Sequence, residues 1–303
     1  MDKPKALVLC RWLVGALSAL AALCSASDSH PASPAAKPSH EMAQLAIIID
    51  DLGYNLRLGQ RTLNLAGDIT VAVLPFTPHG QELAEYAYQQ GKEVMLHAPM
   101  SNHHDYPLGR GGLRSGMSKA EFLRVLRQNL ANVPHVKGVN NHMGSQLTEE
   151  PEPMGWLMAE LQQRQLYFVD SRTSAQTQAL IQAQHIGLPS RKRDVFLDDK
   201  RDTTVIYQQL VLALKKAQQQ GSALAIGHPY PETLQVLEQL PELLSHYKVT
   251  LVKASRLMTS AAPRAAKVVS TTYCLAPPAS LWPSTWAPVD PFGYRPELAE
   301  IDE

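Results

Sequence analysis

The middle of the chain, between about residues 44 and 259, alternates short apolar runs with amphipathic helical stretches. The runs are rich in β-branched residues and occupy positions 45–49, 69–74, 93–96, 138–140, 166–169, 195–197, 223–226 and 249–252. Most are apolar throughout and end in polar residues. Continuous apolar runs of this length are typical of strands buried on both faces of a parallel sheet.

Seven or eight strand–helix units can form a closed parallel barrel or an open, doubly wound sheet. The first run ends in Asp50-Asp51-Leu52-Gly53 and not in a glycine-rich phosphate loop, which disfavours the nucleotide-binding open sheet. The sequence therefore predicts an α/β protein whose domain, at residues 44–259, is an irregular parallel (β/α)7-8 barrel.

Both ends of the chain differ from this pattern. A positive region, an apolar stretch at 12–24 and small residues at 25–27 are typical of a secretory signal peptide, predicted at 1–26; an uncleaved anchor is the alternative. An Ala/Pro/Ser-rich linker is predicted at 27–43, and a Pro-rich, largely disordered tail at 260–303. We expect a periplasmic or secreted mature chain without a membrane span.

The charge balance restricts the partners of the protein. The chain has 28 Lys and Arg residues against 28 Asp and Glu residues, with no surplus of cations for a phosphate backbone, so nucleic acid is not expected as a partner. Its 3 cysteines are too few for a disulfide-based scaffold.

Histidines and carboxylates gather where the apolar runs end. Of the 11 histidines, three follow such a run, and these are His97, His142 and His228. The carboxylates at run ends are Asp50, Asp51, Asp170, Asp198 and Asp199. Any single one of these Asp residues could equally cap a loop or a helix. Because parallel strands present their carboxyl ends on one face of a barrel, the whole set predicts a metal site or an acid–base site there.

Six segments carry a series of motifs in a fixed order. They are IIIDDLG at 47–53, HAPM at 97–100, NNHMGS at 140–145, FVDSRT at 168–173, RDVFLD at 193–198 and AIGHP at 225–229. Together they resemble the divergent polysaccharide deacetylase family, over nearly all of residues 44–258. That family is similar to the NodB-type carbohydrate esterases, so the resemblance implies a distorted barrel and a divalent metal used to remove acetyl groups from sugars.

The resemblance also implies a set of metal ligands. The pair Asp50 and Asp51 matches the two adjacent aspartates of the esterases, one a catalytic base and the other a ligand. Those enzymes take two ligands from a His-x-x-x-His motif, but here Ser101 stands four residues after His97. His142 is therefore our choice for the remaining ligand. The expected site is Zn²⁺ on Asp51, His97 and His142, a ligand number that leaves room for water and substrate.

Further residues complete the expected site. His228 matches the late histidine that acts as general acid, and Asp170 is expected to hold His228 or to orient a ligand. The residues expected to contact substrate are Asn141, Ser145, Arg172 and Asp198.

Three classes of function are compatible with this pattern. The first is an exported metal-dependent hydrolase that removes acyl groups from an envelope polysaccharide or peptidoglycan-like glycan. The second is a non-catalytic exported factor that binds carbohydrate with the same barrel. The third is a metal-free glycosidase with two carboxylates, such as Asp51 and Asp170. The histidines at the run ends favour the first class over the third.

Overall fold

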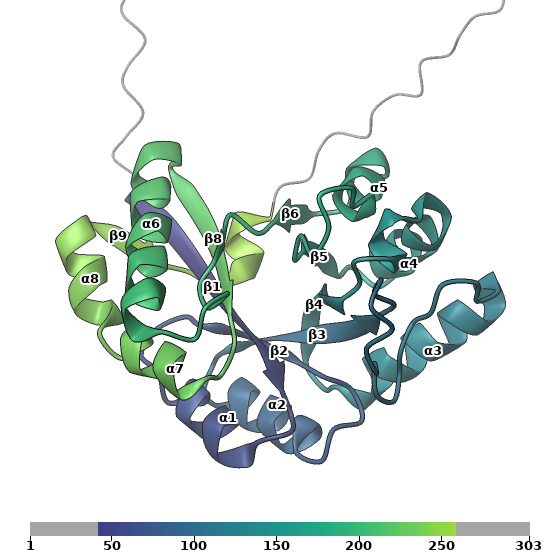
Figure 1. Ribbon diagram of the computed structural model, residues 1–303, viewed down its shortest axis with the longest axis horizontal. Helices are drawn as coiled ribbons and strands as arrows, with labels where there is room; N and C mark the ends of the chain where they lie inside the picture. The colour runs from purple at the N-terminus through teal and green to yellow at the C-terminus, as the bar shows by residue number, and fades with distance from the viewer. Residues whose placement is uncertain (1–41, 259–303) are drawn as a thin grey trace, which may run out of the picture. The chain divides into compact units, whose positions relative to one another are not determined.

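Parallel strands wind into an incomplete barrel with helices on its outside (Figure 1), in a computed structural model that describes residues 42–258. The strands are β1 (Ala43–Leu52), β2 (Thr70–Val73), β3 (Glu93–Met100), β4 (Val136–Met143), β5 (Tyr167–Asp170), β6 (Ser190–Lys192), β7 (Val195–Phe196), β8 (Ser222–Gly227) and β9 (Val249–Leu251). The α-helices are α1 (Leu56–Leu63), α2 (Gly80–Gln89), α3 (Lys119–Asn132), α4 (Pro151–Gln163), α5 (Ala179–His185), α6 (Thr203–Gln220), α7 (Pro231–Leu237) and α8 (Leu240–Tyr247). Two short 3₁₀ turns are η1 (Leu147–Glu149) and η2 (Ala254–Leu257).

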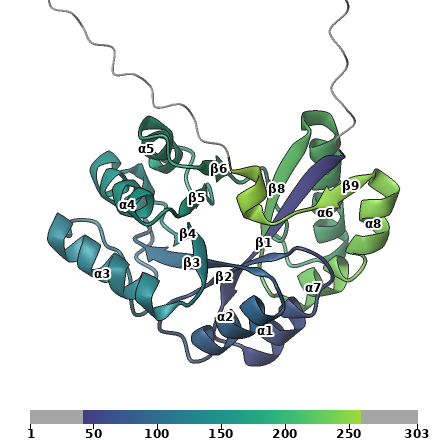
Figure 2. The same ribbon diagram turned by 180° about the vertical axis from the view of Figure 1, so that it is seen from behind.

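The strands form one sheet in the order β6-β5-β4-β3-β2-β1-β8-β7, and every pairing is parallel. Strand β9 pairs with the first residues of β1, as Figure 2 shows from behind. The two ends of this order, β6 and β7, are not paired with each other within the described residues. The barrel is therefore open between β6 and β7, and the expected irregular parallel barrel is confirmed.

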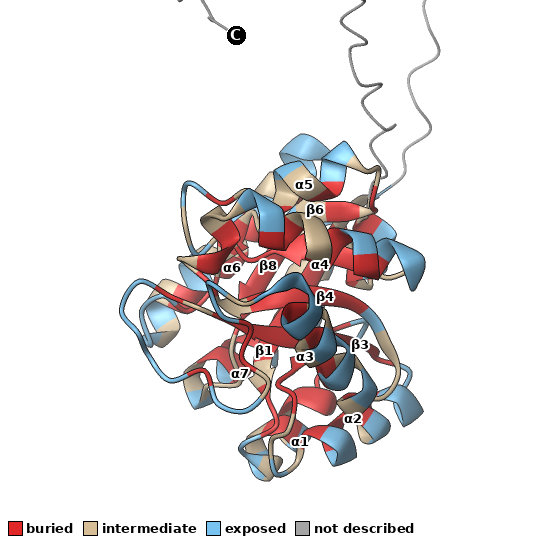
Figure 3. Ribbon diagram, turned by 90° about the vertical axis from the view of Figure 1, so that its right-hand side faces the viewer, coloured by how far each residue is buried: buried red, intermediate tan, exposed pale blue. Residues whose placement is uncertain are grey.

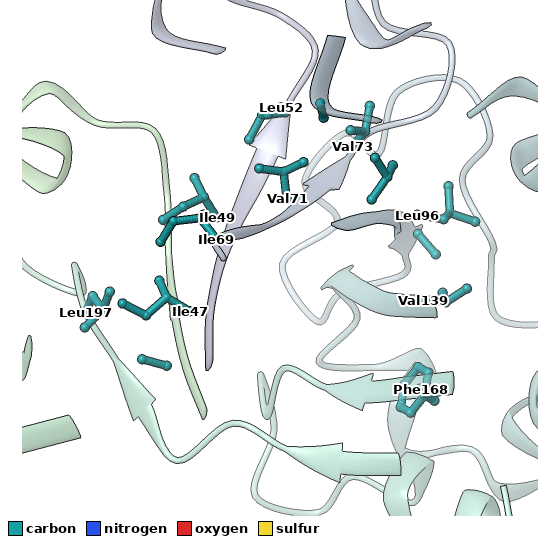
Figure 4. Close-up of a cluster of buried hydrophobic side chains, with 14 of the residues drawn as sticks. Ile47, Ile49, Leu52, Ile69, Val71, Val73, Leu96, Val139, Phe168 and Leu197 are labelled. Carbon is teal, nitrogen blue, oxygen red and sulfur yellow. The ribbon is translucent and has the colours of Figure 1, made fainter. Parts of the chain in front are cut away.

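Alternate residues of each strand build two separate apolar clusters. On β1, Ile47 and Ile49 belong to the larger cluster, which fills the space between the sheet and its helices (Figure 4). Ala46 and Ile48 belong to a smaller cluster inside the barrel, together with residues of η2. Burying one Ile or Leu side chain stabilises a fold by about 1.5–3 kcal/mol, so these clusters are the main source of stability.

The helices bury one face against the sheet and expose the other to solvent (Figure 3). Helix α3 begins after Ser118, whose Oγ accepts a hydrogen bond from the Glu121 amide at 3.3 Å. Helix α6 is capped by Asp202 and ends at Gly221, which has φ +82°. Such caps fix the ends of the helices and so the positions of the loops that carry the site.

Two details of the strands differ from the sequence prediction. Strand β6 was not expected, because its segment, Ser190-Arg191-Lys192, is polar. Strands β3 and β4 extend beyond their apolar runs, since their pairing continues through His97 opposite Asn140 and Pro99 opposite His142. His97 and His142 are therefore parts of strands and not of the loops that follow.

The signal peptide and the tail, predicted at 1–26 and 260–303, lie outside the described residues. So does the predicted linker, except for Met42 and Ala43, and Ala43 already belongs to β1. Within residues 42–258, no helix combines the length and the apolar character needed to cross a bilayer.

Candidate active site

The row of side chains that faces the barrel interior changes from apolar to polar toward the carboxyl ends of the strands. On β3, Met95 belongs to the inner apolar cluster, and His97 follows two residues later on the same face. The polar members of this row are Asp50, His97, Asn140, His142 and His228. Strands β1, β3 and β4, and the residue that follows β8, thus bring these polar side chains together.

Asp51 joins this group through an irregularity in β1. The register of β1 against β2 shifts between Ile49 and Leu52, and Asp51 has φ +58°. This left-handed conformation costs a residue with a side chain about 1–2 kcal/mol, so the surrounding structure must enforce it. Regular alternation would have pointed Asp50 and Asp51 to opposite faces, whereas the irregularity brings both carboxylates to the same site.

Three potential ligand atoms lie within contact distance of one another. Oδ1 of Asp51 is 2.8 Å from Nδ1 of His142 and 3.2 Å from Nε2 of His97. The two imidazole nitrogens are 3.2 Å apart. Atoms with this spacing can share one ion at the usual Zn–N and Zn–O distances of about 2.1 Å.

Oδ1 of Asp51 is the atom that indicates a cation. It is buried, and it accepts no hydrogen bond although two imidazole nitrogens are close to it. Burial alone would raise its pKa, but His142 and His97 hold the pKa of Asp51 well below its usual range. A buried, ionised carboxylate oxygen without a hydrogen bond, next to two imidazoles, is a donor set that fits a divalent metal ion.

Asn140 orients His97 toward this group. Its Oδ1 lies 2.7 Å from Nδ1 of His97, and its Nδ2 donates to Oδ1 of Asp50 at 2.7 Å. Because the amide oxygen can only accept, Nδ1 of His97 carries a proton, and Nε2 of the neutral ring faces Asp51 with its lone pair. Burial opposes the charged ring, but the Asp50 and Asp51 charges raise the pKa of His97. The same negative charge would attract a metal cation.

Asp50 is a buried carboxylate beside the three potential ligands. Its Oδ2 is 3.7 Å from Nε2 of His97, and its side chain is only 4% exposed. Burial raises the pKa of Asp50 and outweighs the opposing effects of His97, His228 and Asn140. A raised pKa makes this carboxylate a better proton acceptor than an exposed one.

His228 is held by Asp198. Nδ1 of His228 lies 2.9 Å from Oδ1 of Asp198, and the His228 amide donates to Oδ2 at 2.6 Å. Thr233 donates to the same Oδ2 at 2.7 Å. Burial would lower the pKa of His228, but the hydrogen bond and charge of Asp198 raise it to about 9. Nε2, the free edge of a protonated ring, lies 3.8 Å from Oδ2 of Asp51.

These groups open into a pocket of about 400 Å³. Its walls include Asp50, His97, Asn141, His142, Arg172, Arg193, Phe196 and His228. A smaller hollow of about 160 Å³ is lined by Asp51, His142 and Tyr54. The polar row is therefore accessible to a ligand.

The structure corrects the expected contact between Asp170 and His228. Strand β5 points Tyr167 and Val169 into the barrel, so Asp170 falls on the opposite face. Its carboxylate accepts hydrogen bonds from Thr177 Oγ1 at 3.0 Å and from the Arg172 amide at 2.8 Å. Asp170 shapes the loop after β5, while Asp198 contacts His228.

The four residues expected to contact substrate fall into three different environments. Asn141 and Arg172 line the pocket. Ser145 is not among the residues of its wall, and its Oγ accepts a hydrogen bond from the His103 amide. The predicted substrate contact of Asp198 is wrong, because its side chain is fully buried and its oxygens are occupied by His228 and Thr233.

Two polar residues at the site were not expected from the sequence. Asn140 was given no role of its own in the expected site, although its place two residues before His142 puts both on one face of β4. Arg193 lines the pocket and donates from Nε to the Ser171 carbonyl at 2.7 Å. The signal for Arg193 was a cation two residues before the apolar run at 195–197, where a charge needs a specific partner.

Comparison with known proteins decides the family. The profile described as "Divergent polysaccharide deacetylase" matches residues 47–258, which includes every strand-end residue discussed above. The chain belongs to the divergent polysaccharide deacetylase family.

In this deacetylase family member, Ser101 is not part of the polar row. Its Oγ accepts from the Ser115 amide at 3.1 Å, and the second imidazole beside Asp51 comes from the neighbouring strand, as His142.

Three similar proteins place this deacetylase family member among bacterial relatives. It is 43% identical over 215 residues to a protein of Escherichia coli named "Uncharacterized protein YibQ", covering 71% of this chain and 67% of the relative. It is 36% identical over 208 residues to an uncharacterized protein of Haemophilus influenzae, covering 67% and 74%. The crystal structure of uncharacterized protein ATU2773 from Agrobacterium tumefaciens has a similar fold, with a TM-score of 0.68 at 22% identity, over 71% of this chain and 89% of that one.

Proposed function

We propose that this protein is an exported, metal-dependent hydrolase. It would remove acyl groups, and above all acetyl groups, from a polysaccharide of the cell envelope. One observation carries the proposal. Asp51, His97 and His142 offer three ligand atoms to one point, and Asp50 and His228 lie within 4 Å of these residues in the wall of a pocket. Family membership makes a glycan the first substrate class to test.

Asp51, His97 and His142 would hold the metal, for which we propose Zn²⁺ because two imidazoles and one carboxylate suit it. The bound ion would act as a Lewis acid toward a carbonyl oxygen and would lower the pKa of water. Asn140 fixes the ring of His97 in the orientation that this requires.

Asp50 is proposed as the general base. It is not one of the three proposed ligands, yet it lies 3.7 Å from His97, within reach of a water molecule at the same place. Its raised pKa favours proton uptake, and Asn140 leaves Oδ2 free by donating only to Oδ1. Asp50 would therefore accept the proton of the attacking water.

His228 is proposed as the general acid. Asp198 holds the ring at Nδ1 and keeps it protonated at neutral pH, because it raises the pKa of His228 to about 9. Nε2 then faces the site with a proton to donate. His228 would protonate the amine or alcohol that leaves when the acyl bond breaks.

The pocket suits a sugar ring. Asn141 and Arg172 contribute polar groups to one wall, and Phe196 contributes an aromatic ring. Tyr54, whose side chain is largely exposed, borders the smaller hollow that Asp51 also lines. Polar side chains and exposed aromatic rings together match the alternating hydroxyl and CH surfaces of a glycan.

Export rests on the order of features in the first 26 residues. Expression of the full chain in a bacterial host, followed by fractionation and intact-mass spectrometry, tests it. We expect a periplasmic or secreted protein that begins near Ser27. A cytoplasmic protein that retains Met1 would contradict export without affecting the enzymatic proposal.

The enzymatic proposal is tested by acetate release. The purified protein, loaded with Zn²⁺, Co²⁺ or Ni²⁺, is incubated with oligomers of N-acetylglucosamine and with peptidoglycan fragments. We expect metal-dependent release of acetate that a chelator abolishes. Failure of the fully metal-loaded protein to release acetate from any of these substrates would contradict the proposal.

A further inference from the structure

A second hollow, of about 530 Å³, lies between helix α3 and the loop that follows β3. Three arginines contribute to its wall, Arg110 and Arg114 from the loop and Arg124 from the helix. None of the residues that line the hollow is acidic. We name this hollow the arginine hollow.

The arginine hollow adjoins the proposed active site. Gly109 and Arg110 line both the arginine hollow and the smaller hollow that contains Asp51 and His142. A ligand with several linked units, bound across Asp51, can therefore extend along the loop into the arginine hollow.

The three guanidinium groups have no carboxylate partner among residues 42–258. Arg110 stacks on the ring of Phe76 at 4.4 Å, which leaves its N–H edge free. Arg124 donates from Nη1 to the side-chain oxygen of Gln128 at 3.2 Å, and Gln128 carries no charge. Elsewhere in the described part, buried carboxylates do pair with arginine, as Glu160 does with Arg127. Three like charges facing one cavity attract an anion.

The walls of the arginine hollow are held by hydrogen bonds. Nδ2 of Asn129 donates to the Gly111 carbonyl at 2.8 Å, and Oδ1 of Asn132 accepts from the Phe76 amide at 2.6 Å. Gly111 has φ +86°, and a Cβ there would lie 2.3 Å from Oδ1 of Asn129. The loop is thus fastened to α3, so its backbone needs little ordering when a ligand binds to the exposed arginines.

We propose that the arginine hollow is a subsite for an anionic group, a carboxylate or a phosphate, carried by the glycan on a unit next to the one that reacts. The guanidinium fork matches both oxyanions, which makes arginine the usual residue for either. The proposal rests on the proposed function for its choice of a glycan. It adds that the substrate is an acidic glycan and not a neutral one.

The test compares the affinities of four tetrasaccharides for the full chain by isothermal titration calorimetry, after bound metal and the chelator that removes it have been dialysed away to prevent turnover. The first is neutral, made of N-acetylglucosamine. The second is a peptidoglycan glycan without peptides, whose lactyl groups carry carboxylates, and the third is its methyl ester. The fourth is the neutral tetrasaccharide phosphorylated on one terminal unit.

The variant Arg110→Gln/Arg114→Gln/Arg124→Gln removes the three charges, and Arg256→Gln, at the opposite end of the barrel, removes an exposed charge as a control.

We expect the carboxylated tetrasaccharide to bind at least about tenfold more tightly than its methyl ester, and the difference to fall with added salt. The triple variant should lose this preference, and Arg256→Gln should keep it. A preference confined to the phosphorylated probe would support the subsite with phosphate as its ligand. A preference below twofold, a preference that survives in the triple variant, or no binding of any probe would overturn the proposal.

The outcome of this binding test is independent of the outcome of the acetate-release test. Equal acetate release from the neutral and the carboxylated tetrasaccharide, with equal affinities, would leave the hydrolase standing and reject the subsite. A charge preference in binding without any acetate release would retain the subsite and reject the hydrolase.

Discussion

The side-chain oxygen of Asn140 accepts a hydrogen bond from Nδ1 of His97 over 2.7 Å, inside the barrel, while the amide nitrogen of Asn140 donates to Asp50. One neutral residue thereby controls both a proposed ligand and the proposed base. It selects the ring nitrogen that His97 presents to Asp51, and it selects the carboxylate oxygen of Asp50 that remains free.

Replacement of Asn140 by Ala should weaken metal binding by about 10- to 100-fold, the usual effect of losing a residue that orients a metal ligand. Isothermal titration with Zn²⁺ measures the change. The control is Asn102→Ala, a buried asparagine of the neighbouring loop that contacts Met143 and Tyr106 and none of the ligands. Equal affinities of Asn140→Ala and the wild type would refute the orienting role.

Replacement of His97 or His142 by Ala should remove most of the bound metal, because each change leaves only two ligand atoms. Elemental analysis of the purified variants gives the metal content, and circular dichroism checks the fold. The exposed His246, at the end of α8, provides the matched control His246→Ala, which should keep full occupancy. Normal metal content in both site variants would exclude this ligand set.

The variants Asp50→Asn and His228→Ala should retain metal, since neither residue belongs to the proposed ligand set. Turnover should fall by about 10²-fold or more in each, the scale expected for a lost base or acid. Rates of acetate release and metal content are measured on the same preparations. Turnover that survives both changes would show that proton transfer uses other groups.

Glu160 links α4 to α3, and its ion pairs should make the free energy of unfolding depend on pH. It accepts from Arg127 at 3.0 and 2.8 Å and from Arg164 at 2.7 Å. The Arg127 hydrogen bonds, helped by Arg164, hold the pKa of Glu160 below the ordinary 4.5. Because the pKa is lower in the folded state, this stabilisation is complete above pH 4.5 and is lost as the pH falls through the folded-state pKa.

Glu160→Gln should therefore lower the free energy of unfolding by about 1 kcal/mol at pH 7, and by less near pH 3. Urea unfolding at both pH values measures the difference. Glu121→Gln, an exposed first-turn residue of α3, serves as the comparison. A destabilisation of equal size at both pH values would mean that the ion pairs are not its cause.

Much of the fold was predictable because a strand buried on both faces must be apolar. Eight apolar runs identified eight of the nine strands that residues 42–258 contain, and the polar β6 is the one that was not predicted there. A polar side chain at the end of such a run is costly to bury, so its presence indicates a function. This reasoning selected three histidines and five aspartates from a chain with many other Asp and His residues. They are His97, His142, His228, Asp50, Asp51, Asp170, Asp198 and Asp199.

The tertiary structure decided which of these side chains meet. Asp170 ends an apolar run as Asp50 does, but the alternation of β5 turns it away from the barrel interior, and Asp198 takes the place beside His228. Asp51 reaches His97 and His142 only because its backbone is left-handed, and no residue pattern specifies this conformation. The arginine hollow, likewise, exists only because a loop and α3, apart in the sequence, pack together. The sequence by itself determined where polar groups end the buried strands, whereas contacts between distant segments determined which of those groups face one another.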